Sequence, residues 1–429
     1  MSKSLKEKKM KAFVKILTFV LLLSVLASCA APAAPAAPAE PAAPAAPAEP
    51  AAPAEPAAPA EPAAPAEPTL TPKDAWLKAN QLGPFDTGEQ DWAAIEEAAK
   101  KEGTVIVYAN SSKIAKAAEM WAEKYPDIKL EGYDLGGDDV LSKTIGEQES
   151  GLFVGDVWFS SGGADIFGTI LPKQYAWRFV PTGLNVPEEL TQPFLVSRFG
   201  TTILAYNSEL NDTCPVSNLW ELTQPEWKGK VVIEDPLNDA STLSKLITYV
   251  YHADEMAAAY KELYGEDPKL DSDTPDAGWL WLKRFAQNNP IPQPGGDEVD
   301  SAFATPGMTD NYLAFTSYSN YPDVQEGNLV FEPCWDAKPV AGVQNQSYLA
   351  IINQAQHPNA AKLFIRFVME EGKDPWAKFG TYFALSDYEV PEGMKTLAEI
   401  REVTWLLTEE FAYQNMVQAR DFYLLNLGK

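Results

Sequence analysis

The stretch DWAAIEEAAKKEGTVIVY, residues 91–108, decides how the folded part of this chain is built. Asp91 is a good N-cap residue, because its carboxylate can accept a hydrogen bond from a free amide of the first helical turn. Apolar residues between Trp92 and Ala99 recur on one face of the following helix, and Gly103 is a typical helix terminator. The apolar run at 104–108 then predicts a buried strand. A helix followed directly by a buried strand is the repeating unit of an α/β fold.

The same alternation continues along the chain. Apolar spacing at Ile114, Ala117 and Trp121 marks the next helix, and His357-Pro358 places a proline in the first turn of a later one. The patterns predict strands at 156–159, 201–206, 231–233 and 313–315, and helices at 242–264, 277–288 and 358–369. The predicted fold class is α/β. At about 350 residues the folded part exceeds the usual size of one hydrophobic core, so two domains are expected.

The first 28 residues have the layout of a lipoprotein signal peptide. Lysines precede an apolar run at 16–27, which is shorter than the roughly 20 apolar residues that span a bilayer. The run ends in Leu26-Ala27-Ser28-Cys29, which matches the bacterial lipobox. We therefore expect cleavage after Ser28, a lipid on Cys29, and a protein held on the extracytoplasmic face of the cell membrane by that lipid alone.

Residues 29–68 form a spacer in which proline stands at every third position from Pro32 to Pro68. Alanine and a few glutamates fill the other positions. Such a segment cannot build a core, but it suits polyproline II, which has three residues per turn and advances by roughly 3.1 Å per residue. We expect a semi-rigid linker that lifts the folded part away from the membrane.

The charge balance excludes one class of partner. The chain carries 60 acidic against 34 basic residues and a formal net charge of −26, so nucleic-acid binding is not expected. After Cys29, two cysteines remain, Cys214 and Cys334. Export permits a disulfide between them, but two separate buried thiols fit the sequence equally well.

Common catalytic sites lack their minimal parts. The chain has two histidines and contains no HExxH, CxxC, GxSxG or P-loop motif. His252 lies in an amphipathic pattern and His357 at a helix start, so both are expected to be structural. We predict no catalytic residue, no resident metal and no cofactor.

Three predicted strands run into short polar loops that open helices. The side chains in these loops could bind an anionic or hydroxylated group at a helix N-terminus, although ordinary helix capping explains any one of them. The candidate binding residues are Asn110, Ser111, Ser112, Ser160, Ser161, Ser241 and Thr242. A fourth strand leads to Tyr318 and Tyr321, whose phenols could contact a ligand or merely cover a loop.

The order of these motifs resembles the substrate-binding proteins of ABC importers, in the branch that includes the ferric-iron-binding proteins. The similarity rests on residues 91–108, LAYN at 204–207, LWELTQPEWKGKVVI at 219–233, GGD at 295–297, the strand end at Ser317-Tyr318 and HPNAAKLFIRF at 357–367. The PEWKGK stretch is the most specific of these. Together the matching stretches span nearly all of residues 91–390.

The resemblance implies a two-lobed type II clamshell with a hinge. Lobe 1 would comprise residues 69–206, lobe 2 residues 207–325, and residues 326–429 would return to lobe 1 and supply the C-terminal helices. The candidate loop residues and Tyr318 would line the cleft, and Arg198 would stand where related receptors hold an anion. The partners would be a small-molecule or ion ligand and an ABC permease with its ATPase.

The ligand class follows from the loop chemistry. Ferric-binding relatives use adjacent tyrosines with an imidazole or carboxylate, whereas Tyr318 and Tyr321 are three residues apart and the first loop is neutral. We therefore expect a small organic or anionic solute, with ferric iron as the alternative. Readings of another class are an exported cleft enzyme and a sensor.

Overall fold

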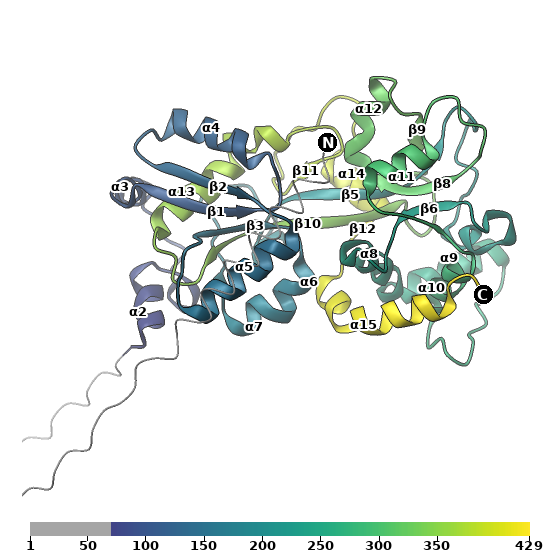
Figure 1. The fold of residues 1–429 in the computed structure, drawn as a ribbon, viewed down its shortest axis with the longest axis horizontal. Coiled ribbons are helices and arrows are strands. Elements are labelled where there is room, and N and C mark those ends of the chain that lie inside the picture. The colour runs from purple at the N-terminus through teal and green to yellow at the C-terminus, as the bar shows by residue number, and fades with distance from the viewer. Residues whose placement is uncertain (1–69) are drawn as a thin grey trace, which may run out of the picture. The chain divides into compact units, whose positions relative to one another are not determined.

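Residues 70–429 are described in a computed structural model, and their helices are arranged around one large mixed sheet (Figure 1). The expected signal peptide, the lipidation site Cys29 and the proline-rich spacer lie outside the described residues. The α/β class predicted from the sequence is confirmed.

The opening helix and strand form as the sequence predicts. Helix α3 (Trp92–Glu102) begins at Asp91, whose side chain accepts a hydrogen bond from the Ala94 amide at 3.1 Å. It ends at Gly103, which adopts the left-handed conformation with φ of 71°. Strand β1 (Thr104–Ala109) follows directly. The capping and termination signals of this stretch are therefore confirmed.

The sheet has two halves, each built on parallel strands. In the first half, β2 (Lys129–Asp134), β1 and β3 (Val157–Ser160) lie side by side. In the second half, β8 (Leu313–Ser317), β6 (Val231–Glu234) and β7 (Ile291–Gln293) do the same. Because ligands of open α/β sheets bind beyond the carboxyl ends of parallel strands, these ends are the places to look for a site.

Two long antiparallel strands join the halves. They are β5 (Leu195–Asn207) and β10 (Gly342–Ile352), which pair with each other along most of their length. The end of β10 also pairs with β3, and the end of β5 also pairs with β8. Strand β5 is longer than the predicted 201–206, because it belongs to both halves. Short strands complete the sheet: β4 (Ala176–Trp177), β9 (Phe331–Pro333), β11 (Tyr382–Phe383) and β12 (Thr404–Leu406).

Helices cover both faces of the sheet. On the first half, α3, α4 (Ile114–Lys124) and α13 (Pro358–Met369) pack on one face and α5 (Gly137–Ser150) on the other. On the second half, α8 (Ala240–Tyr251), α10 (Ala277–Gln287) and α15 (Glu409–Asn426) pack around a core that contains Trp220, Trp281 and Phe285. The remaining α-helices of residues 70–429 are α2 (Pro72–Ala79), α6 (Gly163–Asp165), α7 (Leu171–Lys173), α9 (Ala253–Tyr264), α11 (Gly296–Phe303), α12 (Tyr321–Gln325) and α14 (Leu397–Val403).

One helix prediction is wrong. The expected helix at 242–264 is two helices, α8 (Ala240–Tyr251) and α9, separated at His252. The imidazole ring of His252 stacks on Trp405, with 3.9 Å between ring centroids, and a neighbouring residue on α8, Thr248, accepts a hydrogen bond from the Thr408 amide. Contacts with a distant part of the chain therefore accompany a break that local periodicity does not show. The helices predicted at 277–288 and 358–369 are confirmed.

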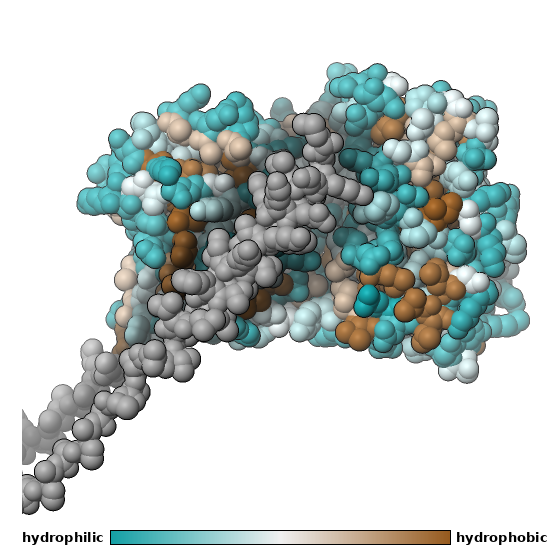
Figure 2. Space-filling view, in the orientation of Figure 1, coloured by the Kyte–Doolittle hydropathy of each residue, from teal (hydrophilic) through white to brown (hydrophobic). Residues whose placement is uncertain are grey.

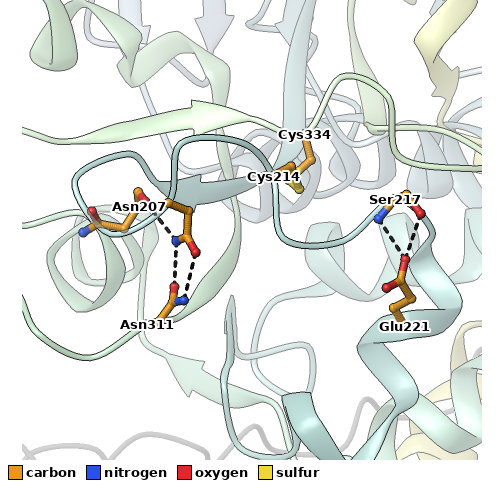
Figure 3. Close-up of a disulfide and its surroundings, with 7 residues drawn as sticks. Asn207, Cys214, Ser217, Glu221, Asn311 and Cys334 are labelled. Carbon is orange, nitrogen blue, oxygen red and sulfur yellow. Dashed lines mark hydrogen bonds between the residues drawn. A yellow bond between two sulfur atoms is a disulfide. The ribbon is translucent and has the colours of Figure 1, made fainter.

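A disulfide joins Cys214 to Cys334, with 5.3 Å between their Cα atoms (Figure 3). Of the two alternatives that the sequence leaves open, the structure contains the bonded one. The bridge connects the loop after β5 to the loop after β9, and it closes a loop of 120 residues. Nearby, Glu221 accepts hydrogen bonds from the amide and the hydroxyl of Ser217 at 2.8 and 3.0 Å.

The surface in Figure 2 is mostly hydrophilic, as the acidic composition predicts. An apolar patch lies over α15, where Val417, Leu424 and Leu425 are each more than half exposed. Within residues 70–429, no helix combines the length and the apolar composition that a membrane crossing requires.

Candidate functional site

The loops that follow β1 and β3 are joined by hydrogen bonds. The Asn110 side-chain amide donates to the Ser161 hydroxyl at 2.6 Å, and the Ser161 backbone amide donates to the Asn110 side chain at 3.4 Å. Ser160 is buried, and its hydroxyl donates to the Ser161 carbonyl at 2.7 Å. Three of the predicted site residues therefore lie together at the carboxyl ends of neighbouring strands.

Ser111 and Arg198 belong to the same region. The indole of Trp376 donates a hydrogen bond to the Ser111 hydroxyl at 2.9 Å, and its ring lies against Phe159. The guanidinium carbon of Arg198 lies 4.8 Å from the Phe159 ring centroid and 5.2 Å from that of Trp376. The arginine is therefore held beside the serine loop by two aromatic rings. These cation–π contacts compensate only part of the cost of burying its charge.

Three cations gather at this point. Burial lowers the pKa of Arg198 to about 10. Burial also lowers the pKa of Lys113, and the positive charges of Lys378 and Arg198 lower it further. Nη1 of Arg198 is buried and has no hydrogen-bond partner among residues 70–429, and none of the three cations pairs with a carboxylate there. A bound anion would accept hydrogen bonds from Arg198. Its negative charge would also offset the repulsion among the three cations.

Ser112 stands at the solvent edge of this group. It is exposed and lies in the turn that leads into α4. Lys113 occupies the N-cap position of α4, and among the described residues it makes no side-chain capping bond. A helix that starts with a cation rather than an oxygen acceptor leaves its positive end available to an anion.

Ser241 and Thr242 lie in the first turn of α8, and no described contact joins them to the serine loop. The Thr242 backbone amide donates a hydrogen bond to the Asp239 side chain at 2.5 Å, and the Thr242 hydroxyl donates one to the Glu234 side chain at 3.1 Å. Ser241 is exposed. The bond to Asp239 is ordinary helix capping, whereas the bond to Glu234 joins the start of α8 to the end of β6.

Tyr318 and Tyr321 lie in an aromatic cluster after β8. Their ring centroids are 5.5 Å apart, and both rings contact Phe379. The Tyr321 hydroxyl donates to Glu332 at 2.9 Å. Burial and Glu332 raise the pKa of Tyr321 to about 12, and burial raises the pKa of Tyr318 as well. Both phenols are therefore protonated at neutral pH.

One segment outside the predicted site residues connects these groups. Residues 376–379, Trp-Ala-Lys-Phe, contact Ser111 through Trp376 and the two tyrosines through Phe379. A signal was present, because two aromatic residues and a lysine stand in a short stretch between Pro375 and Gly380. The segment carries both an aromatic wall and one of the three cations.

We expect the Trp376 hydrogen bond to stabilise this arrangement measurably. Trp376→Phe keeps a buried ring but removes the donor to Ser111, so the free energy of unfolding should fall by about 1 kcal/mol. Urea denaturation of W376F, S111A and the double variant measures the coupling between the two residues. Strictly additive single effects would show that the bond contributes nothing.

No family model matches the chain, and no curated protein matches it by sequence. Solved structures do match its fold. Iron-bound HitA from Pseudomonas aeruginosa is 17% identical, with a TM-score of 0.57 over 74% of this chain and 99% of that one. The Trichodesmium protein IdiA (FutA), in complex with iron and citrate, is 15% identical, with a TM-score of 0.54 over 76% and 100% of the two chains.

A substrate-binding protein of an ABC transporter from Agrobacterium tumefaciens is 13% identical, with a TM-score of 0.55 over 76% of this chain and 94% of that one. At such low identity these matches establish the fold. The predicted two-lobed architecture is thereby confirmed: the chain has the fold of the type II periplasmic binding proteins.

Proposed function

We propose that this protein is the extracytoplasmic substrate-binding protein of an ABC importer and that its ligand carries an anionic group. One observation carries the ligand class: Arg198, together with Lys113 and Lys378, has no carboxylate partner in the described chain. The substrate-binding role is supported by the fold and by the ABC-transporter protein from Agrobacterium tumefaciens among the similar structures.

The protein works by capture without chemistry. Ligand held at Arg198 gains contacts from the other lobe when β5 and β10 flex, so binding shifts the population toward a closed form that the permease recognises. In this proposal lobe 1 comprises residues 69–206 and lobe 2 residues 207–325. Residues 326–429 return to lobe 1 and supply the C-terminal helices. A lipid on Cys29 and the proline-rich spacer keep the receptor near the permease and raise its effective concentration there.

Ferric iron is the second candidate, and the similar structures favour it. HitA is described as iron-bound, and the Trichodesmium protein holds both iron and citrate. In this chain Tyr318, Tyr321 and Glu332 would supply hard oxygen donors once the phenols lose their protons. An iron complex with a carboxylate anion would use both the phenols and Arg198.

A thermal-shift series on the full-length chain in detergent separates the candidates. The probes are citrate, phosphate, Fe(III) alone and Fe(III)–citrate. A ligand present at 100 times its dissociation constant stabilises by about 2.7 kcal/mol. A shift with citrate or phosphate alone supports the anionic solute, and a shift only with Fe(III)–citrate supports the ferric complex. If none of the four probes raises the melting temperature, the proposed ligand class is wrong.

A further inference from the structure

A second cavity lies beside the N-terminus of α15. It is a groove of about 530 Å³, within the range of small-molecule sites. Its walls come from both halves of the sheet region: Phe167 follows α6, Gln346 and Tyr348 lie on β10, and Tyr251 ends α8. The first turns of α15 close it. None of the candidate residues from the sequence lines this groove.

The amide side chains of the groove present acceptors. The Gln346 amide nitrogen donates to the Leu407 carbonyl and the Gln414 amide nitrogen donates to Glu410, both at 3.4 Å. Each bond uses one N–H of its amide group and does not involve the amide oxygen. The Gln346 oxygen is buried, and nothing in residues 70–429 donates a hydrogen bond to it. A ligand that satisfies the Gln346 oxygen must donate a hydrogen bond to it.

Two carboxyl groups, those of Glu409 and Glu410, line the groove. Glu409 is only 5% exposed, and its Oε2 has no hydrogen-bond partner in the described chain. It packs against Gly163, where a Cβ atom would lie 0.7 Å from that oxygen. Burial raises the pKa of Glu409 to about 8, and the negative charge of Asp165 contributes. Glu410 is exposed at the rim.

Aromatic rings complete the wall. Tyr251, 53% exposed, packs edge-on against Phe411 with 5.2 Å between ring centroids. Phe167 and Tyr348 are further lining rings. The lining residues include no lysine, arginine or histidine. Aromatic faces combined with carboxylates and free acceptors are the setting that binds an organic ammonium group.

We propose that this groove binds a small organic ammonium cation, such as a diamine. One ammonium group donates to Gln346 and lies near Glu409, while the other reaches Glu410 and the Tyr251 face at the rim. Such a ligand touches β10 and α15 together and stiffens the junction between the two halves. None of the proposed anion-binding residues lines the groove, although its Tyr348 pairs with Ser160 in the sheet and its Glu409 packs against Gly163.

Isothermal titration of the full-length chain with 1,4-diaminobutane tests the proposal, with 1,4-butanediol as the neutral control of equal length. We expect the diamine to bind and the diol to give no heat. Glu410→Gln and Tyr251→Ala should each weaken diamine binding about tenfold, in line with the loss of one charge or one cation–π contact. Glu262→Gln, an exposed change on α9, is the matched control and should leave affinity unchanged.

Proton release supplies a second readout. A cation beside Glu409 lowers its pKa from about 8, so binding at pH 8 should release protons in proportion to the bound diamine. Titrations in two buffers of different ionisation enthalpy measure that number. The proposal fails if the diamine gives no heat, if the diol binds equally well, or if E410Q and Y251A both keep the parent affinity.

Discussion

Replacing Arg198 with glutamine should lower the affinity for the anionic probe identified by thermal shift between 10- and 100-fold. The guanidinium is the most buried of the three cations, and it is held between Phe159 and Trp376 with one nitrogen unpartnered in the described residues. A charge-assisted hydrogen bond contributes about 1.5–3 kcal/mol, which corresponds to this range. Isothermal titration of parent and variant measures the ratio.

The same substitution should not destabilise the unliganded protein. Arg198 carries a buried charge without a compensating carboxylate in the chain from 70 to 429, so removing that charge removes a desolvation cost. We expect urea denaturation to give an unchanged or slightly raised free energy of unfolding for R198Q. Lys113→Gln and Lys378→Gln, at less buried positions, should weaken binding several-fold. Arg178→Gln, next to Asp86, is the control.

Unchanged affinity in R198Q would remove Arg198 from the site. An equal loss in R178Q would show that net charge, rather than position, controls binding.

Loss of the Cys214–Cys334 disulfide should cost about 2–5 kcal/mol of stability. The bridge closes a loop of 120 residues, and restricting so long a loop in the unfolded chain is expected to stabilise the fold substantially. Cys334 is only 1% exposed, so reductant should act slowly on the folded protein. Urea denaturation of Cys214→Ala/Cys334→Ala, with and without dithiothreitol, measures the effect.

Dithiothreitol should leave the free energy of unfolding of the double variant unchanged. The free energy of unfolding of the parent should fall to that of the variant once its disulfide is reduced. Equal stability of parent and variant under oxidising conditions would show that the bridge does not stabilise the fold.

Local signals in the sequence were sufficient for the regular elements. The Asp91 cap, the Gly103 terminator and the helix that starts at Pro358 each depend on residues within a few positions of one another. The length of β5 was underestimated because its first residues pair with β10, about 150 positions away. The break at His252 likewise accompanies stacking on Trp405, a contact that no local pattern contains.

The candidate site depends on both local and distant residues. Asn110, Ser111, Ser160 and Ser161 follow strands, so the strand-to-helix pattern was enough to select them, and the structure brings them together with Arg198. Trp376 and Lys378 reach the loop from more than 260 positions away. No spacing rule connects such distant residues. Tyr318 and Tyr321 end a strand as expected, but their rings pack on Phe379.

The most direct test of the central claim is a crystal structure of the protein grown with the probe that gives the largest thermal shift. We expect density for the anionic group within hydrogen-bond distance of the Arg198 guanidinium, flanked by Lys113 and the Ser111–Ser112 loop, with the lobes closed around it. Density for the probe at another place, with Arg198 still unpartnered, would contradict the proposed site and the ligand class that rests on it.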